Sequence, residues 1–191
     1  MNRIRKAVKR IPVTVVLVLI ILLITAGGVL AAAMNFRAHL DESFAAVPVL
    51  DNVDSLAQGQ AIFQFNDDGT IYYKLNVANI ENIFMAHIHL IPAPGQSGLG
   101  AIVVWLYPRS CPPPGPTSPL YLKGRTDGVL AEGVITDADL QSASGITTGE
   151  QLRQAMAEGK VYVNVHTNDF VAPPNTGPGD YPAGEIHGPI H

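Results

Sequence analysis

Histidine is the residue type in this sequence with the clearest potential for metal chemistry. His87 and His89 flank a single isoleucine, and in a β-strand this spacing places both imidazoles on one face, about 7 Å apart along the chain. Two further histidines, His166 and His187, lie in segments with strand character, each on the less apolar face. Imidazole nitrogens suit copper and zinc. The pattern therefore predicts a copper or zinc site formed by His87, His89, His166 and His187.

A simpler interpretation of the same histidines stays open. Buried polar groups form hydrogen bonds, so these imidazoles could instead bond to backbone and carboxylate groups and fix loops in place. The other two histidines are left outside the candidate site. His39 lies in a polar segment where solvation is expected, and His191 is at a chain end, where residues are usually mobile.

No known catalytic motif accompanies the histidines. The sequence contains no G-x-S-x-G, no glycine-rich phosphate loop and no H-E-x-x-H, so it predicts no catalytic residues and favours a protein that is not an enzyme. The only cysteine, Cys111, lies among prolines and has no partner for a disulfide within the chain. It is expected to be an exposed thiol or, alternatively, to form an intermolecular disulfide.

Short strands separated by turns must position the histidines. Residues 61–65 and 70–77 are rich in β-branched and aromatic residues and flank Asn66-Asp67-Asp68-Gly69, which predicts a β-hairpin. A capping box of Thr147 and Glu150 predicts a helix over residues 149–158. Further strands are predicted at 83–90, 101–107, 128–135, 160–167 and 184–190, with Phe84, Ala86, Ile88 and Leu90 on one face of the first and Val161, Val163 and Val165 facing inward in 160–167. The fold class is all-β, an antiparallel sandwich or barrel with one or two short helices.

The amino-terminal part of the chain has the features of a membrane signal. Of the 12 basic residues, five lie within residues 1–10, and residues 11–33 carry no charge. As a helix, those 23 residues would extend about 34 Å, enough for a hydrocarbon core of roughly 30 Å. The segment is either a transmembrane anchor or a signal peptide, since Ala31-Ala32-Ala33 offers a cleavage site.

Residues 34–56 are then expected to be a stalk and residues 57–191 a single β domain. Basic residues before the span place the domain outside the membrane, or release it if the signal is cleaved. The exported part retains seven basic against 16 acidic residues, a formal charge near −9. This acidity argues against nucleic acid as a partner. The expected partners are the membrane, through the amino-terminal helix, and a protein at the cell surface.

Four segments in order resemble the CHRD domain, a family named for chordin: Ala86-His87-Ile88-His89, Gly133-Val134-Ile135-Thr136 with Asp139-Leu140, Gly159 to Thr167, and Gly184-Glu185-Ile186. The resemblance runs from about Leu56 to Ile190. It implies an extracytoplasmic β-sandwich or barrel, here of the single-domain, membrane-anchored type found in prokaryotes. Chordin itself binds growth factors.

The chain departs from the family pattern in two places. His187 and Pro189 stand where the family ending G-E-I-R-G-Q has arginine and glutamine, and the glycine expected soon after His89 is delayed to Gly95. A histidine in place of arginine exchanges a permanent cation for a possible metal ligand.

Two functions follow from these observations. The first is a membrane-anchored binding or structural module outside the cell, with the histidines in packing or in a metal site. The alternative is a copper- or zinc-binding protein that uses the His-x-His strand. Chemistry like that of copper/zinc superoxide dismutase is a weaker extension, because it rests on architecture and the single cysteine cannot supply that family's disulfide.

Overall fold

The computed structural model describes residues 35–44, 47, 50, 53–109 and 112–191. Residues 33–191 form one compact unit, separate from residues 1–32. The predicted basic segment and membrane span, together with Cys111, therefore lie outside the described residues. In the part of the chain that the structure describes, no helix has both the length and the apolar character needed to cross a bilayer.

The described residues form a mostly antiparallel β domain, which confirms the predicted fold class. The predicted hairpin is present, and the helix expected near residue 149 begins there. The strands are β1 (Asn35–Leu40), β2 (Gln58–Phe65), β3 (Ile71–Leu90), β4 (Ile102–Tyr107), β5 (Leu122–Ile135), β6 (Val161–Thr167) and β7 (Ile186–Pro189), and the helix is α2 (Gly149–Ala157).

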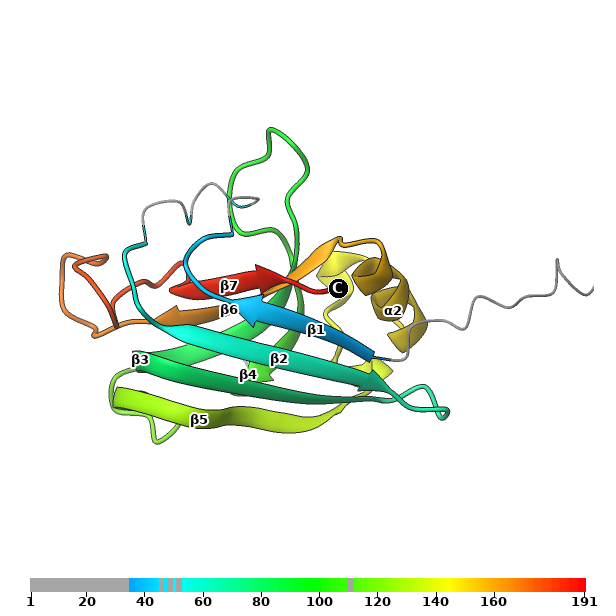
Figure 1. The fold of residues 1–191 in the computed structure, drawn as a ribbon, viewed down its shortest axis with the longest axis horizontal. Helices are drawn as coiled ribbons and strands as arrows, with labels where there is room; N and C mark the ends of the chain where they lie inside the picture. The colour runs from blue at the N-terminus through cyan, green and yellow to red at the C-terminus, as the bar shows by residue number, and fades with distance from the viewer. Residues whose placement is uncertain (1–34, 45–46, 48–49, 51–52, 110–111) are drawn as a thin grey trace, which may run out of the picture. The chain divides into compact units, whose positions relative to one another are not determined.

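The longest strand, β3, connects all parts of the sheet (Figure 1). Its first half pairs with β2 and β5, and its last residues pair with β6 and β4. The sequence predicted two strands here, at 70–77 and 83–90, and that break is wrong. Asn79 and Asn82 instead adopt positive φ angles of 56° and 54° within one continuous strand. Asparagine tolerates this conformation better than most residues. Both asparagines also form hydrogen bonds with β5, and that strand begins at Leu122, earlier than the sequence predicted.

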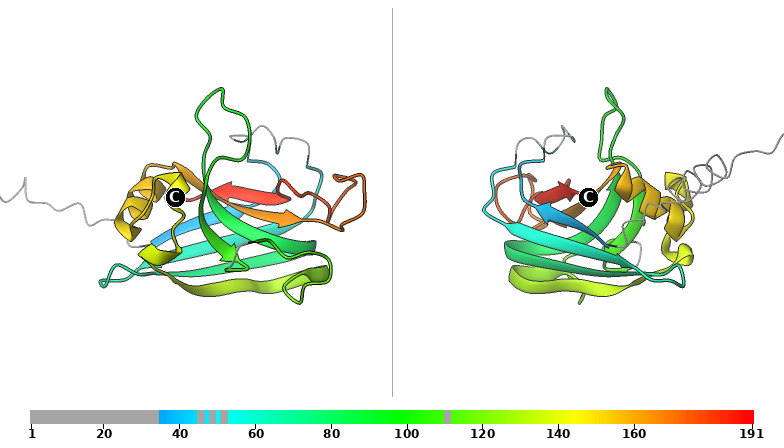
Figure 2. Two further views of the ribbon diagram at one scale, coloured as in Figure 1. Left: turned by 180° about the vertical axis from the view of Figure 1, so that it is seen from behind. Right: turned by 45° about the vertical axis from the view of Figure 1, so that its right-hand side comes forward.

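Strands β1 and β7 close the sheet into a barrel. The strand order is β1-β2-β3-β6-β7. The two ends of this order meet through backbone hydrogen bonds of Arg37 in β1 with His191, just after β7 (2.9 and 3.0 Å), and of His187 in β7 with Asp41, just after β1. Gly188 permits this approach, because a Cβ there would lie 1.8 Å from the carbonyl oxygen of His39. Figure 2 shows β7 beside β1 from further directions.

Strand β1 lies in the segment for which the sequence predicted a stalk. Its residues alternate between exposed and buried, with Phe36, Ala38 and Leu40 directed into the core. Its full length pairs with β2. Apolar and polar residues alternate over only the six residues of β1. So short an alternation is hard to recognise within the mixed composition of residues 34–56.

Helix α2 packs Leu152, Ala155 and Met156 against the barrel core. Its observed N-cap is Thr148, whose hydroxyl accepts a hydrogen bond from the backbone N–H of Gln151, so the predicted box of Thr147 and Glu150 is displaced by one residue. Either pair satisfies the same sequence rule, and the backbone geometry selects between them.

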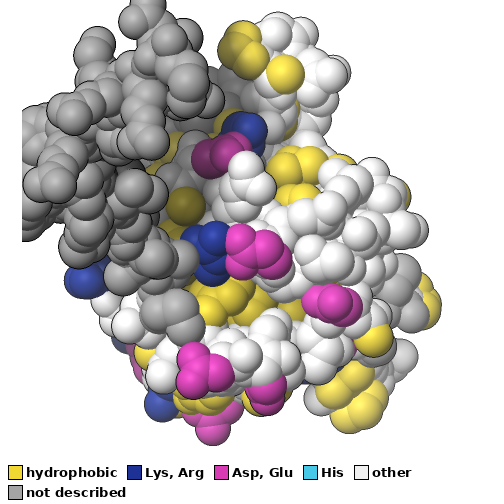
Figure 3. All heavy atoms as spheres, turned by 90° about the vertical axis from the view of Figure 1, so that its right-hand side faces the viewer, with side chains coloured by type: hydrophobic (Ala, Val, Ile, Leu, Met, Phe, Trp, Pro, Cys, Tyr) yellow, Lys and Arg dark blue, Asp and Glu magenta, His cyan; other side chains and the backbone are white. Residues whose placement is uncertain are grey.

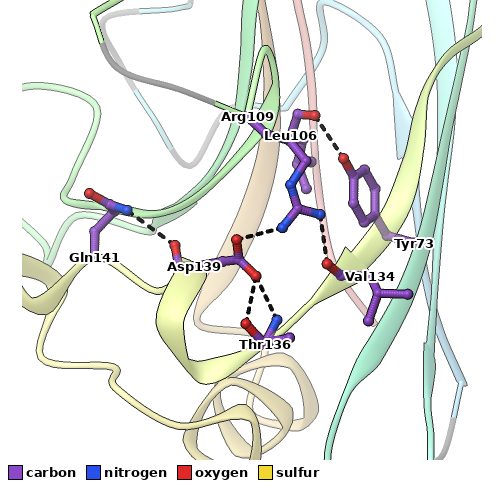
Figure 4. Close-up of polar contacts among 7 residues, drawn as sticks. All are labelled: Tyr73, Leu106, Arg109, Val134, Thr136, Asp139 and Gln141. Atoms are coloured by element: carbon purple, nitrogen blue, oxygen red, sulfur yellow. Dashed lines mark hydrogen bonds and ion pairs between the residues drawn. The ribbon is translucent and has the colours of Figure 1, made fainter.

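Arg109, immediately after β4, joins three segments of the barrel wall (Figure 4). Its guanidinium donates to the carbonyl oxygen of Val134, pairs with Asp139 at 2.5 Å, and lies over the ring of Tyr73. Burial would raise the pKa of Asp139, but hydrogen bonds from Arg109 and Thr136 hold it below its usual value. Asp139, which forms a capping box with Thr136, therefore also links Arg109 to the 3-10 turn that follows β5.

Ion pairs distribute charge over the domain surface in a mixed pattern. Examples include the pairs of Arg153 with Glu150 and of Lys160 with Glu158. On the face shown in Figure 3, basic and acidic side chains lie close together and form no patch of one sign.

Candidate metal centre

Side chains alternate between the two faces of the barrel wall along β3 and β6. One set points into the barrel core, and the other set forms the outer face, which loops cover. On β6, Val161, Val163 and Val165 join the barrel core, as predicted, while Tyr162 and His166 point outward. On β3 the inward residues are Ala86 and Ile88, which leaves His87 and His89 on the outer face.

Loops bury this outer face instead of leaving it in solvent. A small apolar cluster of Val47, Leu50 and Tyr162 lies over it, packed against Phe44, Ile91, Leu99 and Ala183 from three loops. As a result every residue of β6 is buried on both sides of the sheet. The exposed fractions of His87, His89 and His166 are 1%, 3% and 1%.

Three of the four predicted ligands converge. Each of His87, His89 and His166 offers one nitrogen, and these nitrogens lie within 4.8 Å of one another. The shortest separation is 3.2 Å, between Nδ1 of His87 and Nε2 of His166. Two nitrogen ligands bound to a tetrahedral zinc ion at Zn–N distances of 2.0–2.1 Å lie about 3.3 Å apart. The nitrogens of His87 and His166 already have nearly this separation. We refer to these three residues as the histidine cluster.

Backbone carbonyls fix the tautomer and direction of two of the rings. His89 donates from Nδ1 to the carbonyl oxygen of Gly100 at 3.1 Å, and His166 donates from Nδ1 to that of Pro182 at 3.0 Å. A carbonyl can only accept, so the Nε2 atom of each ring carries a lone pair. Such a bond on the far nitrogen is the usual outer support of a histidine metal ligand.

The rings are neutral at physiological pH. Burial, together with the imidazoles of His166 and His89, lowers the pKa of His87 to about 2. Burial lowers the pKa of His166 to about 3 and that of His89 to about 4, in each case against the effect of the backbone hydrogen bond. Metal binding requires a deprotonated imidazole nitrogen, so the buried environment keeps the cluster in its binding form.

Aromatic rings surround the cluster. Tyr162 stacks on His89 with ring centroids 5.4 Å apart, and Trp105 of β4 meets His87 edge-on at 4.1 Å. The ring of Phe84 lies 6.2 Å from that of His166. The sequence placed Phe84 on the opposite face of its strand. That placement is wrong because the pairing of β3 with β6 shifts between Ile83 and Met85.

The fourth predicted ligand, His187, lies outside the group of three. It is buried on β7 opposite Asn164, and its backbone exchanges hydrogen bonds with Asp41 of the neighbouring chain segment. Its ring lies 6.2 Å from that of Phe44. Strand character alone could not show which of the four histidines share one point in space.

A fully buried carboxyl group holds the loops around the cluster. Glu185 accepts hydrogen bonds from the hydroxyls of Ser55 (2.6 Å) and Thr167 (2.7 Å) and from the backbone N–H of Gly179 (2.8 Å). Gly184, just before it, has φ of 138°, and a Cβ there would lie 2.0 Å from Oδ1 of Asn164. Sequence reasoning missed this supporting role, as it missed the carbonyls of Gly100 and Pro182, which have no side-chain signature.

A comparison with protein families identifies the domain. The model of the CHRD domain matches residues 36–173, a range that begins with β1 and includes the whole histidine cluster. The chain belongs to the CHRD domain family. Neither the curated proteins nor the solved structures compared with the chain gave a match. Three of the segments that carry the resemblance are adjacent in this CHRD domain: 86–89 lies in β3, 159–167 leads into and forms β6, and 184–186 leads into β7.

Proposed function

We propose that this CHRD domain is a binding module for a transition metal ion, copper or zinc, with His87, His89 and His166 as the protein ligands. The observation that carries the proposal is the convergence of three buried, neutral imidazoles, with two nitrogens already 3.2 Å apart. Packing alone does not explain the cluster, because Nε2 of His89, the ring nitrogen left free by the bond of Nδ1 to Gly100, is buried without a hydrogen-bond partner among the described residues. A buried polar atom without a partner is costly and marks a missing ligand or ion.

The hydrogen bonds of the three rings indicate which nitrogen of each histidine would bind the ion. His89 and His166 would bind through Nε2, since their Nδ1 atoms are held by carbonyls. His87 would bind through Nδ1, the nitrogen that faces His166, which requires its proton to move to Nε2. In a tetrahedral site the ligand nitrogens would be about 3.3 Å apart. The nitrogens of the cluster lie within 4.8 Å of one another, so no nitrogen–nitrogen distance needs to shorten by more than about 1.5 Å. An ion bound there would act as a Lewis acid or a structural link between β3 and β6.

The full-length protein, purified in mild detergent and dialysed, is expected to hold about one copper or zinc ion per chain by elemental analysis. The double variant His87→Ala/His89→Ala should lower the affinity at least about 100-fold, because two of three ligands are lost. Trp105 is the only tryptophan of the sequence and its ring lies 4.1 Å from that of His87, so copper(II) should quench its fluorescence.

The matched control is His39→Ala, because the side chain of His39 is 68% exposed and lies on β1. It should keep the wild-type metal content and the same fluorescence response. A wild-type protein that stays metal-free after loading with both ions, with unchanged Trp105 fluorescence, would contradict the proposal. The double variant retaining the ion would contradict the assignment of the ligands.

We further propose that the domain is displayed outside the membrane, anchored or released by residues 11–33. The support is the charge distribution, with five basic residues before an uncharged run of 23. A membrane-impermeant amine reagent applied to intact cells should label a Lys6→Arg/Lys9→Arg variant, whose remaining lysines, among them the 65% exposed Lys160, are in the domain. Labelling seen only after lysis, together with that of a cytosolic marker, would contradict this location.

A further inference from the structure

Met85 is a neighbour of the histidine cluster both across the sheet and along its own strand. It stands directly opposite His166 in the pairing of β3 with β6, and it precedes His87 by two residues on β3. Directly opposed residues of antiparallel strands have Cβ atoms about 5 Å apart on the same face, and residues two apart in a strand share a face. The side chain of Met85 is half-buried.

Alternation along β3 puts this methionine on the outer face with the histidines, and a local irregularity in the strand comes just before it. Between Ile83, paired with Thr167, and Met85, paired with His166, β3 has one residue more than β6. The extra residue is Phe84, whose ring lies near His166. From Met85 to Leu90 the pairing is continuous, so the alternation that places His87 and His89 outward also applies to Met85.

The electrostatic surroundings of the cluster favour a cation of low charge. Among the described residues, the group of possible ligand atoms within 4.8 Å of one another consists of His87, His89 and His166 and includes no carboxylate. The cost of transferring an ion from water to a buried site is large and rises steeply with its charge. A divalent ion would gain no compensation from a nearby acidic group, whereas a monovalent ion has less hydration to lose.

We propose that the cluster selects copper(I), and that the thioether sulfur of Met85 completes its coordination together with His87, His89 and His166. The inference rests on the proposed metal-binding function and narrows it to one ion. Copper(I) is a soft cation that binds thioether and imidazole ligands well, while zinc gains little from a thioether. Met85 is thus a specificity-determining residue, and its contribution should differ between the two metals.

The test compares Met85→Leu with the wild-type full-length protein under anaerobic, reducing conditions. Copper(I) affinity is measured by competition with a chromogenic copper(I) chelator, and zinc affinity by a zinc-responsive dye. Met85→Leu conserves volume, and it should weaken copper(I) binding about tenfold or more while zinc binding changes less than about twofold. Copper X-ray absorption should show a sulfur neighbour in the wild type and none in the variant.

The matched control is Met156→Leu, the same exchange at a fully buried methionine of α2 in the barrel core. Its copper(I) affinity should equal that of the wild type. Met85→Gln serves as a second variant that removes the sulfur but keeps the chain length. Equal copper(I) affinity in wild type and both Met85 variants, or an equal loss for both metals, would overturn the role of Met85. A wild-type protein that binds neither metal would instead overturn the proposed function itself.

Discussion

Lowering the pH from 7 to 5 is expected to reduce the free energy of unfolding of the metal-free protein by roughly 6 kcal/mol. In the unfolded chain His87, His89 and His166 would have ordinary pKa values near 6.5. In the folded domain burial lowers those pKa values to about 2, 4 and 3, respectively. Between pH 6.5 and about 4 the unfolded state therefore binds protons that the folded state does not.

The sign of the effect follows from this difference in bound protons. The contribution of these histidines to the free energy of unfolding is fully present above their unfolded pKa of about 6.5. It falls as the pH decreases, by about 2 kcal/mol for each of the three histidines between pH 7 and 5. Carboxyl groups such as Asp41 and Asp139, whose pKa values lie below their usual range near 4, lose their contributions only at lower pH. The interval from pH 7 to 5 thus isolates the histidines.

Urea denaturation in the presence of a chelator, repeated at several pH values, measures the loss directly. The variant His89→Gln should lose about 2 kcal/mol less stability than the wild type between pH 7 and 5, since one of the three histidines with lowered pKa values is removed. A stability that is constant between pH 7 and 5 would show that the cluster is accessible to water and protonated without unfolding.

Replacing the buried glutamate in Glu185→Ala should destabilise the domain by about 3–5 kcal/mol. The substitution leaves three buried donors without an acceptor, those of Ser55, Thr167 and the backbone of Gly179. Each donor left unsatisfied costs about 1–3 kcal/mol. The segments that contain Ser55 and Gly179 also contribute Leu50 and Ala183 to the cover of the outer face, so metal affinity should fall together with stability.

Glu185→Gln provides a graded comparison, because its carboxamide keeps one acceptor oxygen and places an NH₂ group against the remaining donors. It should lie between wild type and Glu185→Ala in the midpoint of chemical denaturation. Glu132→Ala, at an exposed position on β5, should change stability by less than about 0.5 kcal/mol. If Glu185→Ala behaved like Glu132→Ala, the hydrogen bonds of Glu185 would not be what holds these loops.

The sequence predicted the histidine pair and the strands beneath it because both follow local periodicity. Val161, Val163 and Val165 alternate with polar residues, and this pattern alone assigns the inner face of β6. It could not show that the outer face is buried as well, since the covering residues, such as Val47 and Leu99, come from distant loops.

Two further features depended on information that local patterns do not contain. The bulge at Phe84 is a property of the pairing between β3 and β6, so alternation within one strand assigned this ring to the wrong face. Strand β1 owes its place to its partners on both sides, β2 and the end of the chain beyond β7. Likewise, the separation of His187 from the cluster is set by strand order, which no spacing rule supplies.

The closing contact between β1 and the segment at β7 also has a consequence for folding, because it joins distant parts of the sequence. Arg37 and His191 are more than 150 residues apart in the chain, so their pairing is among the most non-local contacts in the domain, and such topologies fold slowly. While the chain emerges from its amino end, β1 and β6 each retain an unpaired edge until β7 has been made. Exposed edges can pair with other chains, so the nascent domain is most prone to aggregation immediately before its last strand is added.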